Sequence, residues 1–366
     1  MRIALASAFA WPEVTRGGER YLHDLASYLH SRGHQVDVVA GTDQRSGVET
    51  IDGVRFVWRH RRLPAFLARR GTTGFDVFGA AALLPLLRRR YDVVHCLAPT
   101  AAVAARLGGQ CTILTVMGHP TDDQLGLRPL DRQLMSAGVC AAHTITAYSE
   151  ASAVAVEAIF GRRAVALNLG VRLERFPIDP EPRLGAPRIL FPAYAADARK
   201  RVDLLLQAMP AILDARPDAR VALLGGGAQD WAFDGLGDDE QRVRAAVDDL
   251  GRHVDDVGQF FRDATVVVLP SRYEAFGVVL VESLASGTPV VCTDDGGMPE
   301  IVTDPKVGRV APPDDPAGLA EAILAVIELA AQPSTPARCA AHARRWDWDE
   351  AIGPAHEALY ERVVGR

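Results

Sequence analysis

Short apolar runs alternate with amphipathic stretches along the whole chain. The runs are apolar from end to end, which indicates strands that helices cover on both faces. The stretches between them, such as Glu19–Arg32 and Ser149–Phe160, repeat apolar residues at helical spacing. The chain is therefore predicted to be an α/β protein with doubly wound parallel sheets. In the first half, strands are predicted at Arg2–Ser7, Gln35–Val39, Val54–Trp58, Asp92–Cys96, Thr112–Val116, Thr144–Ala147 and Ala164–Leu167.

A proline-rich stretch at 177–187 divides this pattern in two. Four prolines with glycine and charged residues are typical of a linker. We expect two Rossmann-like domains, at 1–180 and 185–345, that face each other across a cleft. The tail at 346–366 repeats apolar residues at helical steps, and this helix either caps its own domain or crosses back to the first. In the second half, strands are predicted at Arg188–Phe191, Arg220–Leu224, Thr265–Leu269 and Pro289–Cys292, with a helix at Val202–Ala215.

The composition is that of an ordinary globular protein. Of 366 residues, 48% are apolar and 23% are charged, and no run of 18 apolar residues occurs. The five cysteines are scattered without metal-ligand spacing, and the N-terminus lacks the layout of a signal peptide, so a cytoplasmic location is expected. Lys200 and Lys306 are the only lysines among 40 basic residues. Such a preference for arginine indicates a GC-rich bacterial genome.

Positive charge is concentrated in the first half. Residues 1–180 carry 21 basic and 16 acidic side chains, whereas residues 181–366 carry 19 and 30. Either this asymmetry is drift, or the first domain meets an anionic ligand; a nucleic-acid partner is not expected. The stretch RHRRLPAFLARR at 59–70 is either a solvated loop and helix or an element that contacts the inner face of a membrane peripherally.

The sequence PSRYEAFGVVLVESLASGTPVV at 270–291 carries the candidate chemistry. A helix is predicted from about Gly277 to Ser286, so its N-terminus lies at the carboxyl edge of the sheet, where ligands of open α/β sheets bind. Amide groups at such an N-terminus favour a diphosphate, which Gly277 allows to approach closely. Glu274 and Glu282 lie within about 80° of each other on helical geometry and can face one site. A carboxylate such as Glu282 can accept both hydroxyl protons of a ribose.

This block resembles the signature of the retaining GT-B glycosyltransferases of family 4, also described as glycosyl transferases group 1. The resemblance spans nearly the full chain, and the two-glutamate block is highly specific. It implies a GT-B fold and a nucleotide-sugar donor, with UDP as the default nucleotide. The other segments that carry it are GGERYLHDLASYLHSRGHQVDVV at 17–39, LGVRLERF at 169–176, KRVDLLLQAM at 200–209 and LPSRYEAFG at 269–277.

The resemblance also implies roles for individual residues. Gly17 and Gly18 resemble the glycine loop that closes over the donor. Lys200 resembles the lysine that neutralises the diphosphate, where a fixed cation stabilises the charge that develops as the bond breaks. Glu274 resembles the residue that holds the sugar hydroxyls, and Glu282 the one that holds the ribose. The implied nucleotide-sugar site comprises Gly17, Gly18, Arg199, Lys200, Glu274, Ala275, Phe276, Gly277, Val278 and Glu282, and the implied catalytic residues are Lys200, Glu274 and His119.

The chain departs from the family pattern at three places, one of which is Leu169-Gly170-Val171 near the linker, where asparagine-glycine-valine is usual and Asn168 is displaced by one. A glycine and an arginine usually stand a few residues before the lysine, but here Ala193 and Tyr194 do. Either Arg199 substitutes for that arginine, or the diphosphate has one cation fewer. A histidine is also expected after the fifth strand, but Met117 takes its place. His119 follows two residues later, where it either contacts the donor sugar or acceptor or has a structural role.

The implied reaction transfers a hexosyl or N-acetylhexosaminyl group, with retention, to a hydroxyl of a small-molecule or lipid-linked acceptor. Two alternatives remain open: a sugar-nucleotide 2-epimerase of the same architecture, and a catalytically silent carbohydrate-binding partner subunit. An NAD-dependent oxidoreductase is not favoured, because the loop after the first strand lacks GxGxxG. Acidic doublets such as Asp294-Asp295 and Asp314-Asp315 are expected to be solvated or at helix ends, so no metal and no cofactor are predicted.

Overall fold

The computed structural model describes the chain except for residues 15–16, 62–72, 123–124, 126–128, 252–255 and 366. It contains two compact units. Unit 1 comprises Met1–Gly170 together with Trp348–Arg366, and unit 2 comprises Val171–Asp347. The chain therefore enters unit 2 once and returns to unit 1 for its last helix, and the proline-rich stretch at 177–187 lies within unit 2.

Unit 1 is built on a sheet of eight described strands in the order β3-β4-β2-β1-β5-β6-β7-β8. All neighbouring strands run parallel except β3 and β4. The order reverses beside β1, which has β2 on one side and β5 on the other, so the sheet is doubly wound as predicted. The strands are β1 (Arg2–Ser7), β2 (Gln35–Thr42), β3 (Gly47–Ile51), β4 (Val54–His60), β5 (Val93–Cys96), β6 (Thr112–Val116), β7 (Thr144–Ala147) and β8 (Val165–Ala166).

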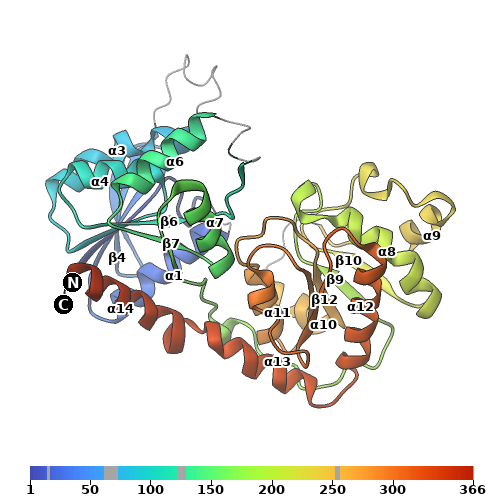
Figure 1. Ribbon diagram of the computed structural model, residues 1–366. Coiled ribbons are helices and arrows are strands. Elements are labelled where there is room, and N and C mark those ends of the chain that lie inside the picture. The colour runs from blue at the N-terminus through green and yellow to red at the C-terminus, as the bar shows by residue number, and fades with distance from the viewer. Residues whose placement is uncertain (15–16, 62–72, 123–124, 126–128, 252–255, 366) are drawn as a thin grey trace. The chain divides into compact units, whose positions relative to one another are not determined.

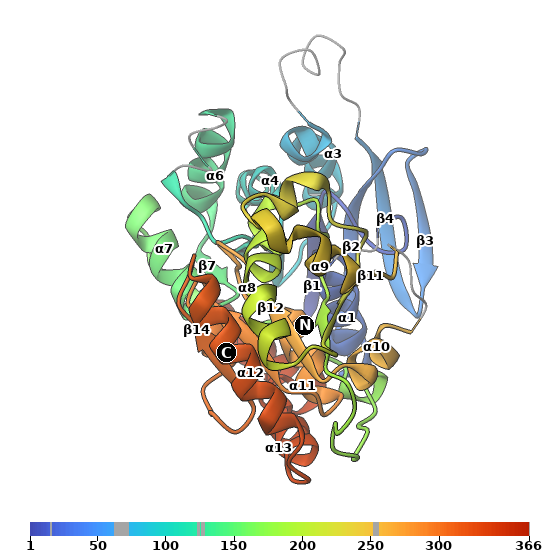
Figure 2. The same cartoon turned by 90° about the vertical axis from the view of Figure 1, so that its right-hand side faces the viewer.

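The antiparallel edge strand β3 was not predicted. Its first four residues are exposed, so it carries no buried apolar run. It joins β4 at the outer edge of the sheet (Figure 2) through a turn at Asp52 and Gly53, whose φ angles are 50° and 80°. Two consecutive positive φ angles are typical of the tight hairpin turn that Asp-Gly favours. That dipeptide is the sequence signal that could have located the hairpin.

Helices cover both faces of this sheet. On one face α3 packs on α4 and α4 packs on α6, while α1 and α14 lie together on the other (Figure 1). Strand β1 is buried from its second residue to its last, as strands between two helical layers are. The helices are α1 (Gly17–Ser31), α3 (Gly74–Arg88), α4 (Pro99–Leu107), α6 (Pro129–Ala141), α7 (Glu150–Phe160) and α14 (Gly353–Val364).

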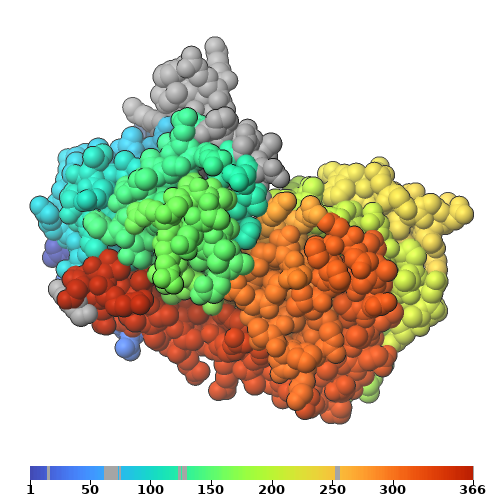
Figure 3. All heavy atoms as spheres, viewed as in Figure 1, coloured from blue at the N-terminus to red at the C-terminus, as the bar shows by residue number. Residues whose placement is uncertain are grey.

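Buried hydrogen bonds attach the C-terminal helix α14 to the rest of unit 1. His356 Nδ1 donates to Ile352 O at 2.7 Å, so its Nε2 accepts from Tyr21 OH, also at 2.7 Å. Tyr360 OH lies 2.6 Å from His95 Nδ1 on β5. His95, His356 and Tyr360 have no exposed surface. The helix, dark red in Figure 3, is thus an integral layer of unit 1.

Unit 2 is built on a parallel sheet of six described strands in the order β11-β10-β9-β12-β13-β14. In chain order this is the 3-2-1-4-5-6 arrangement of the Rossmann fold. Helices α8 and α12 lie side by side (Figure 2). Strands β11 and β14 were not predicted, and two of the three residues of β11 are aspartates. The elements are β9 (Arg188–Phe191), α8 (Val202–Ala215), β10 (Arg220–Leu223), α9 (Glu240–Ala245), β11 (Val247–Asp249), α10 (Val257–Asp263), β12 (Val266–Leu269), α11 (Val278–Ala285), β13 (Val290–Thr293), β14 (Gly308–Ala311), α12 (Pro316–Ala330) and α13 (Thr335–Ala343).

The stretch 59–70, for which a peripheral membrane contact is one of two alternatives, falls mostly outside the described residues. Only its first three residues, 59–61, are described. Within the described part of the chain, no single helix is both long and apolar enough to cross a bilayer; the pair Pro316–Ala330 and Thr335–Trp346, bent by 108°, reaches that length and composition only when taken together. The peripheral contact and the cytoplasmic location stay predictions.

Candidate functional site

The candidate residues of unit 2 gather at one edge of its sheet. Strands β9 and β12 are neighbours where the strand order reverses, so the segments that follow their carboxyl ends emerge side by side. After β9 the chain reaches a short 3₁₀ turn at Ala198–Lys200, and after β12 it forms the loop 270–277. Arg272 N donates to Arg199 O at 2.7 Å and so joins the two segments. Ligands of open α/β sheets bind at this position.

Lys200 and Glu274 form an ion pair at this edge. Lys200 Nζ donates to Glu274 Oε2 at 2.5 Å, and the two side chains are 22% and 19% exposed. An ammonium group has three donors and a carboxylate has about four acceptor sites, so one contact leaves both groups able to bind a ligand. The pair therefore presents a cation and a carboxylate at the same place.

The loop that carries Glu274 is held by the segment after β13. Asp295 Oδ1 accepts from Tyr273 N at 2.5 Å, and Gly297 N donates to Glu274 O at 2.9 Å. A Cβ on Gly296 would lie 2.1 Å from Glu274 O, so only glycine fits there. Tyr273 has a φ of 56°, a conformation that costs a non-glycine residue about 1–3 kcal/mol. The position of Glu274 is thus imposed by its neighbours.

Helix α11 begins directly after this loop. Its N-cap, Gly277, has a φ of 92°, which glycine accommodates without strain. Phe276 is buried, with Ala275 and Val278 half-buried beside it, and Glu282 in the second turn is 5% exposed. The first N–H groups of a helix have no intrahelical partner and carry positive partial charge. The start of α11 therefore offers a site for an anion close to the ion pair.

Arg199 reaches the site through its backbone. Its carbonyl accepts the hydrogen bond that joins the two segments. Its guanidinium is 54% exposed and lies 2.6 Å from the carboxylate of Asp197, on the same turn. Tyr194, at the place of the family's arginine, is 44% exposed. In the structure the Arg199 side chain is thus paired with a near neighbour rather than with Glu274.

Sequence reasoning missed a cluster of charges around the ion pair. Asp314 accepts from Arg201, which follows Lys200, and from Arg272 in the glutamate loop. The φ angles of Arg201, Tyr273 and Asp314 are 54°, 56° and 57°, so three of the four described non-glycine residues with positive φ lie here. Such strained residues cluster at functional sites. No local signal marks Asp314, because its partners lie far away in the sequence.

Several aspartates of the acidic doublets accept hydrogen bonds from the backbone. Asp315 caps α12 by accepting from Ala317 N and Gly318 N, and Asp256 caps α10, as expected of charges at helix ends. Others are ion-paired, as Asp122, Asp248 and Asp314 are, and Asp314 pairs with two arginines. Among the described residues, no three His, Cys, Asp or Glu side chains are grouped so as to hold a metal ion. Independence from metal stays a prediction.

The candidate residues of unit 1 lie near the carboxyl edge of its own sheet. Gly17 and Gly18 begin α1, and a Cβ on Gly18 would lie 3.6 Å from the sulfur of Met117, in the loop after β6. His119 in the same loop is half-buried, with Nδ1 3.2 Å from Ser152 Oγ on α7. The residue at the family's histidine position thus faces Gly18, while His119 contacts α7.

Two family models match the chain over most of its length. The model described as Glycosyltransferase Family 4 matches residues 15–175. The model described as Glycosyl transferases group 1 matches residues 186–329. The first match covers most of unit 1, and the second covers most of unit 2.

Similar sequences are those of glycosyltransferases, and a similar structure shows the same fold. D-inositol 3-phosphate glycosyltransferase of Streptomyces scabiei is 34% identical over 216 residues, which cover 53% of this chain and 48% of that protein. Phosphatidyl-myo-inositol mannosyltransferase of Mycobacterium tuberculosis is 28% identical over 391 aligned positions, which cover 100% of this chain and 98% of that protein. The structure of sucrose-phosphate synthase from Thermosynechococcus elongatus has a TM-score of 0.80 at 21% identity and covers 100% of this chain and 99% of that one.

The sequence matches are to glycosyltransferases, so neither an epimerase nor a silent binding subunit is favoured. The structural match shows the fold, which consists of two parallel-sheet α/β units. The chain therefore belongs to the GT-B glycosyltransferases of family 4.

Proposed function

We propose that the protein is a retaining glycosyltransferase that moves a hexosyl or N-acetylhexosaminyl group from a nucleoside diphosphate, UDP by default, to an acceptor hydroxyl. The observation that carries the proposal is the Lys200–Glu274 pair, held at 2.5 Å beside the start of α11. A cation, a carboxylate and a helix N-terminus at one sheet edge match the parts of a sugar diphosphate.

Lys200 is proposed to bind the diphosphate. Its ammonium group is 22% exposed, so much of the surrounding water is already excluded. In such surroundings a fixed cation stabilises negative charge more strongly than it does in bulk water. The amide groups at the start of α11 add positive partial charge. A Cβ on Gly277 would meet the side chains of Met298 and Leu280 at 3.1 and 3.3 Å, so this position needs glycine for its packing and its φ of 92° rather than for the approach of a phosphate.

The two glutamates are proposed to hold the two sugars of the donor. Glu274 lies at the loop end of the site, where it accepts from the hydroxyl groups of the transferred sugar. Glu282 is 5% exposed in the second turn of α11, and it accepts from the ribose hydroxyls. The backbone amides of Ala275, Phe276 and Val278 are proposed to bind the donor between these two sugars.

The proposed reaction is a front-face substitution. The bond between the anomeric carbon and the diphosphate oxygen breaks, and its electron pair stays on the diphosphate. The acceptor oxygen bonds to the same face of the anomeric carbon, and its proton passes to the departing diphosphate oxygen. The reaction needs no nucleophile from the enzyme. Charge stabilisation by Lys200 and the start of α11 takes the place of a metal ion.

For unit 1 we propose contacts with both substrates. Gly17 and Gly18 at the start of α1 leave room for the donor, and His119 contacts the donor sugar or the acceptor. Two similar proteins are named for inositol-containing phosphate acceptors. We therefore propose a hydroxyl of a phosphate-bearing small molecule or of a lipid-linked acceptor as the site of transfer.

The proposal is tested by hydrolysis of a panel of nucleotide sugars without acceptor, followed by transfer to candidate acceptors. Donor turnover is expected, and NMR of the product should show the anomeric configuration of the donor retained. Lys200→Gln should lower the rate about 10²–10³-fold, the usual effect of removing one charge-stabilising group. Lys306→Gln replaces the other lysine, which is exposed, and should leave the rate unchanged.

Each contrary outcome identifies an alternative. Inversion at the donor's C2 without use of an acceptor would indicate the epimerase. Absence of hydrolysis with every donor, together with absence of transfer, would indicate the silent subunit. A product of inverted anomeric configuration would agree with a glycosyltransferase activity but would refute the retaining mechanism.

A further inference from the structure

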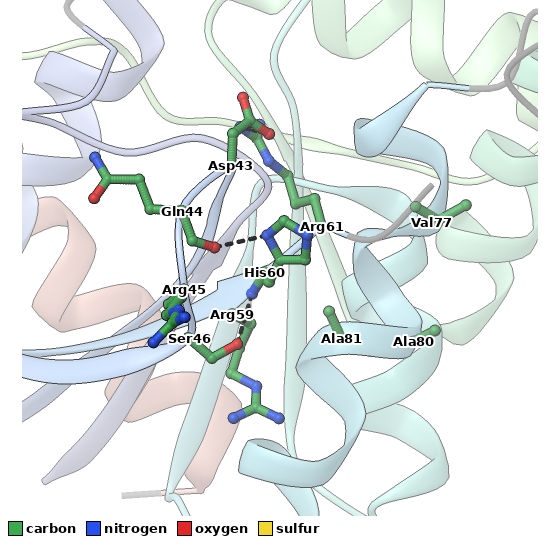
Figure 4. Close-up of a pocket in the computed structure, with 10 residues that line it drawn as sticks. All are labelled: Asp43, Gln44, Arg45, Ser46, Arg59, His60, Arg61, Val77, Ala80 and Ala81. Atoms are coloured by element: carbon green, nitrogen blue, oxygen red, sulfur yellow. Dashed lines mark hydrogen bonds and ion pairs between the residues drawn. The ribbon is translucent and has the colours of Figure 1, made fainter. Parts of the chain in front are cut away.

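A pocket of about 980 Å³ in unit 1 contains none of the residues assigned to the donor (Figure 4). It lies where β2 and β4 end, between the segment 43–46 and helix α3. The described lining residues of α3 have small apolar side chains. On the other side, the described lining residues include three arginines and a histidine against one carboxylate. The pocket is therefore a basic site at the carboxyl edge of the sheet.

Arg61 is the buried cation of this pocket. Its side chain is 4% exposed, and Nη2 lies 2.8 Å from Asp43 Oδ1, a carboxylate that is 85% exposed. Nη1 donates to Ala8 O at 3.0 Å, and the guanidinium stacks 4.3 Å from the centre of the Phe9 ring. Nε is buried and has no hydrogen-bond partner among the described residues. A Cβ on Gly41 would lie 2.5 Å from Arg61 Cδ, so glycine makes room for the side chain.

Arg45 and Arg59 supply two further cations. Within the described part of the chain, neither guanidinium makes a hydrogen bond or an ion pair with another residue. Arg45 is exposed and Arg59 is half-buried, and both line the pocket. Cations that outnumber the carboxylates of a concave site raise the local concentration of anions.

Backbone contacts hold the polar wall of the pocket in place. His60 N donates to Ser46 Oγ at 2.9 Å, and His60 Nδ1 lies 2.6 Å from Gln44 O (Figure 4). Because a carbonyl only accepts, Nδ1 carries the proton of that hydrogen bond. The Ser46 hydroxyl keeps its own proton to donate to a ligand. The segment 43–46 is thus fixed against the end of β4 before any ligand binds.

We propose that this pocket binds a phosphate group and is the subsite for the charged part of the acceptor. The second half of this statement rests on the proposed function. Arginine forks match phosphate oxygens in geometry and charge, and three of the described residues that line the pocket are arginines. The volume exceeds that of one phosphate group, so an ester such as a polyol phosphate or a phospholipid headgroup fits.

The test is a phosphate titration of the full chain. The melting temperature is measured at each phosphate concentration, at a constant ionic strength set with chloride. Inorganic phosphate should raise the melting temperature. In Arg45→Gln/Arg59→Gln the phosphate concentration at half-effect should rise about tenfold or more, which corresponds to the loss of charge-assisted hydrogen bonds. Arg106→Gln, an exposed arginine at the end of α4, should behave as wild type.

Two results would overturn the proposal: the same half-effect concentration in the double variant as in wild type, or no effect of phosphate on wild type. Arg45→Glu is a second variant, on an exposed side chain that the fold does not need. It should weaken phosphate binding relative to wild type. The titration needs neither donor nor turnover, so it stands independently of whether nucleotide sugars are hydrolysed.

Vesicle binding distinguishes the two sources of the phosphate group. Phosphatidylinositol vesicles and phosphatidylcholine vesicles are compared by cosedimentation with the wild type and the double variant. Binding to phosphatidylinositol alone that is lost in the double variant assigns the pocket to a lipid headgroup. Phosphate binding that the double variant weakens, without vesicle binding, assigns it to a soluble phosphate ester.

Discussion

The two buried histidines of unit 1, His95 and His356, should make its free energy of unfolding smaller at pH 5 than at pH 7. Replacing His356 with glutamine is expected to halve this difference. His356 and His95 are buried on opposite sides of the contact between α14 and the sheet, with ring centres 6.2 Å apart. Burial lowers the pKa of His356 from 6.5 to about 4, against the raising effect of its hydrogen bond to Ile352 O. Burial, with a smaller contribution from His356, lowers the pKa of His95 to about 3.

The sign and size follow from proton linkage. Below pH 6.5 the unfolded chain takes up a proton on each histidine, whereas the folded unit does not until the pH approaches 4 or 3. The free energy of unfolding therefore falls as the pH falls, by up to about 1.4 kcal/mol per pH unit for each histidine. Between pH 7 and pH 5 the loss is about 2 kcal/mol for each residue, or about 4 kcal/mol for both.

The assay is urea unfolding of the full chain at pH 7 and pH 5, with the transition of unit 1 followed by hydrogen exchange of β1 and α14 peptides. His356→Gln keeps a donor and an acceptor but does not titrate, so its loss between the two pH values should be about 2 kcal/mol smaller than that of wild type. His30→Gln, on an exposed residue of α1, should lose as much as wild type. An equal loss in His356→Gln and wild type would refute the reasoning.

Three further predictions concern the site in unit 2. Gly296→Ala should destabilise unit 2 by about 1–3 kcal/mol more than Gly237→Ala, as measured by urea unfolding. Both glycines have a positive φ, but a Cβ on Gly296 would lie 2.1 Å from Glu274 O, whereas a Cβ on Gly237 would have no neighbour within 4 Å. Equal destabilisation by the two variants would contradict the clash. Asp314→Asn should cost about 1 kcal/mol or less, because its ion pairs are partly exposed, yet lower donor hydrolysis several-fold. Asp218→Asn, in an exposed ion pair, is its control, and equal activity of the two variants would exclude a positioning role. Removing divalent cations with EDTA should leave the initial rate unchanged, and restoration of a lost rate by Mg²⁺ or Mn²⁺ would refute independence from metal.

Much of the fold could be predicted because buried parallel strands are apolar along their whole length. β1 at Arg2–Ser7 and β6 at Thr112–Val116 have the predicted bounds, and both are almost wholly buried. The strands that were missed lie mainly at sheet edges. β3 is mostly exposed and β11 is largely acidic, so neither displays the burial that the prediction depends on.

The candidate site could be predicted in part. Glu274, Gly277 and Glu282 lie in one segment, where local spacing and the start of a helix indicate an anion site. The charges around them could not be found in this way. Asp314 lies 113 residues from Arg201 and 42 from Arg272, and its neighbour Asp315 is an ordinary helix cap.

The sequence alone determined the two α/β units, the family and the segments that carry the chemistry, because periodicity and motifs are local properties of the chain. Only the tertiary structure decided which distant residues meet. Lys200 and Glu274 pair across 74 positions because β9 and β12 are neighbours where the strand order reverses. Likewise, α14 belongs to unit 1 because the hydrogen-bond partners of His356 and Tyr360 lie on α1 and β5, more than 260 residues away.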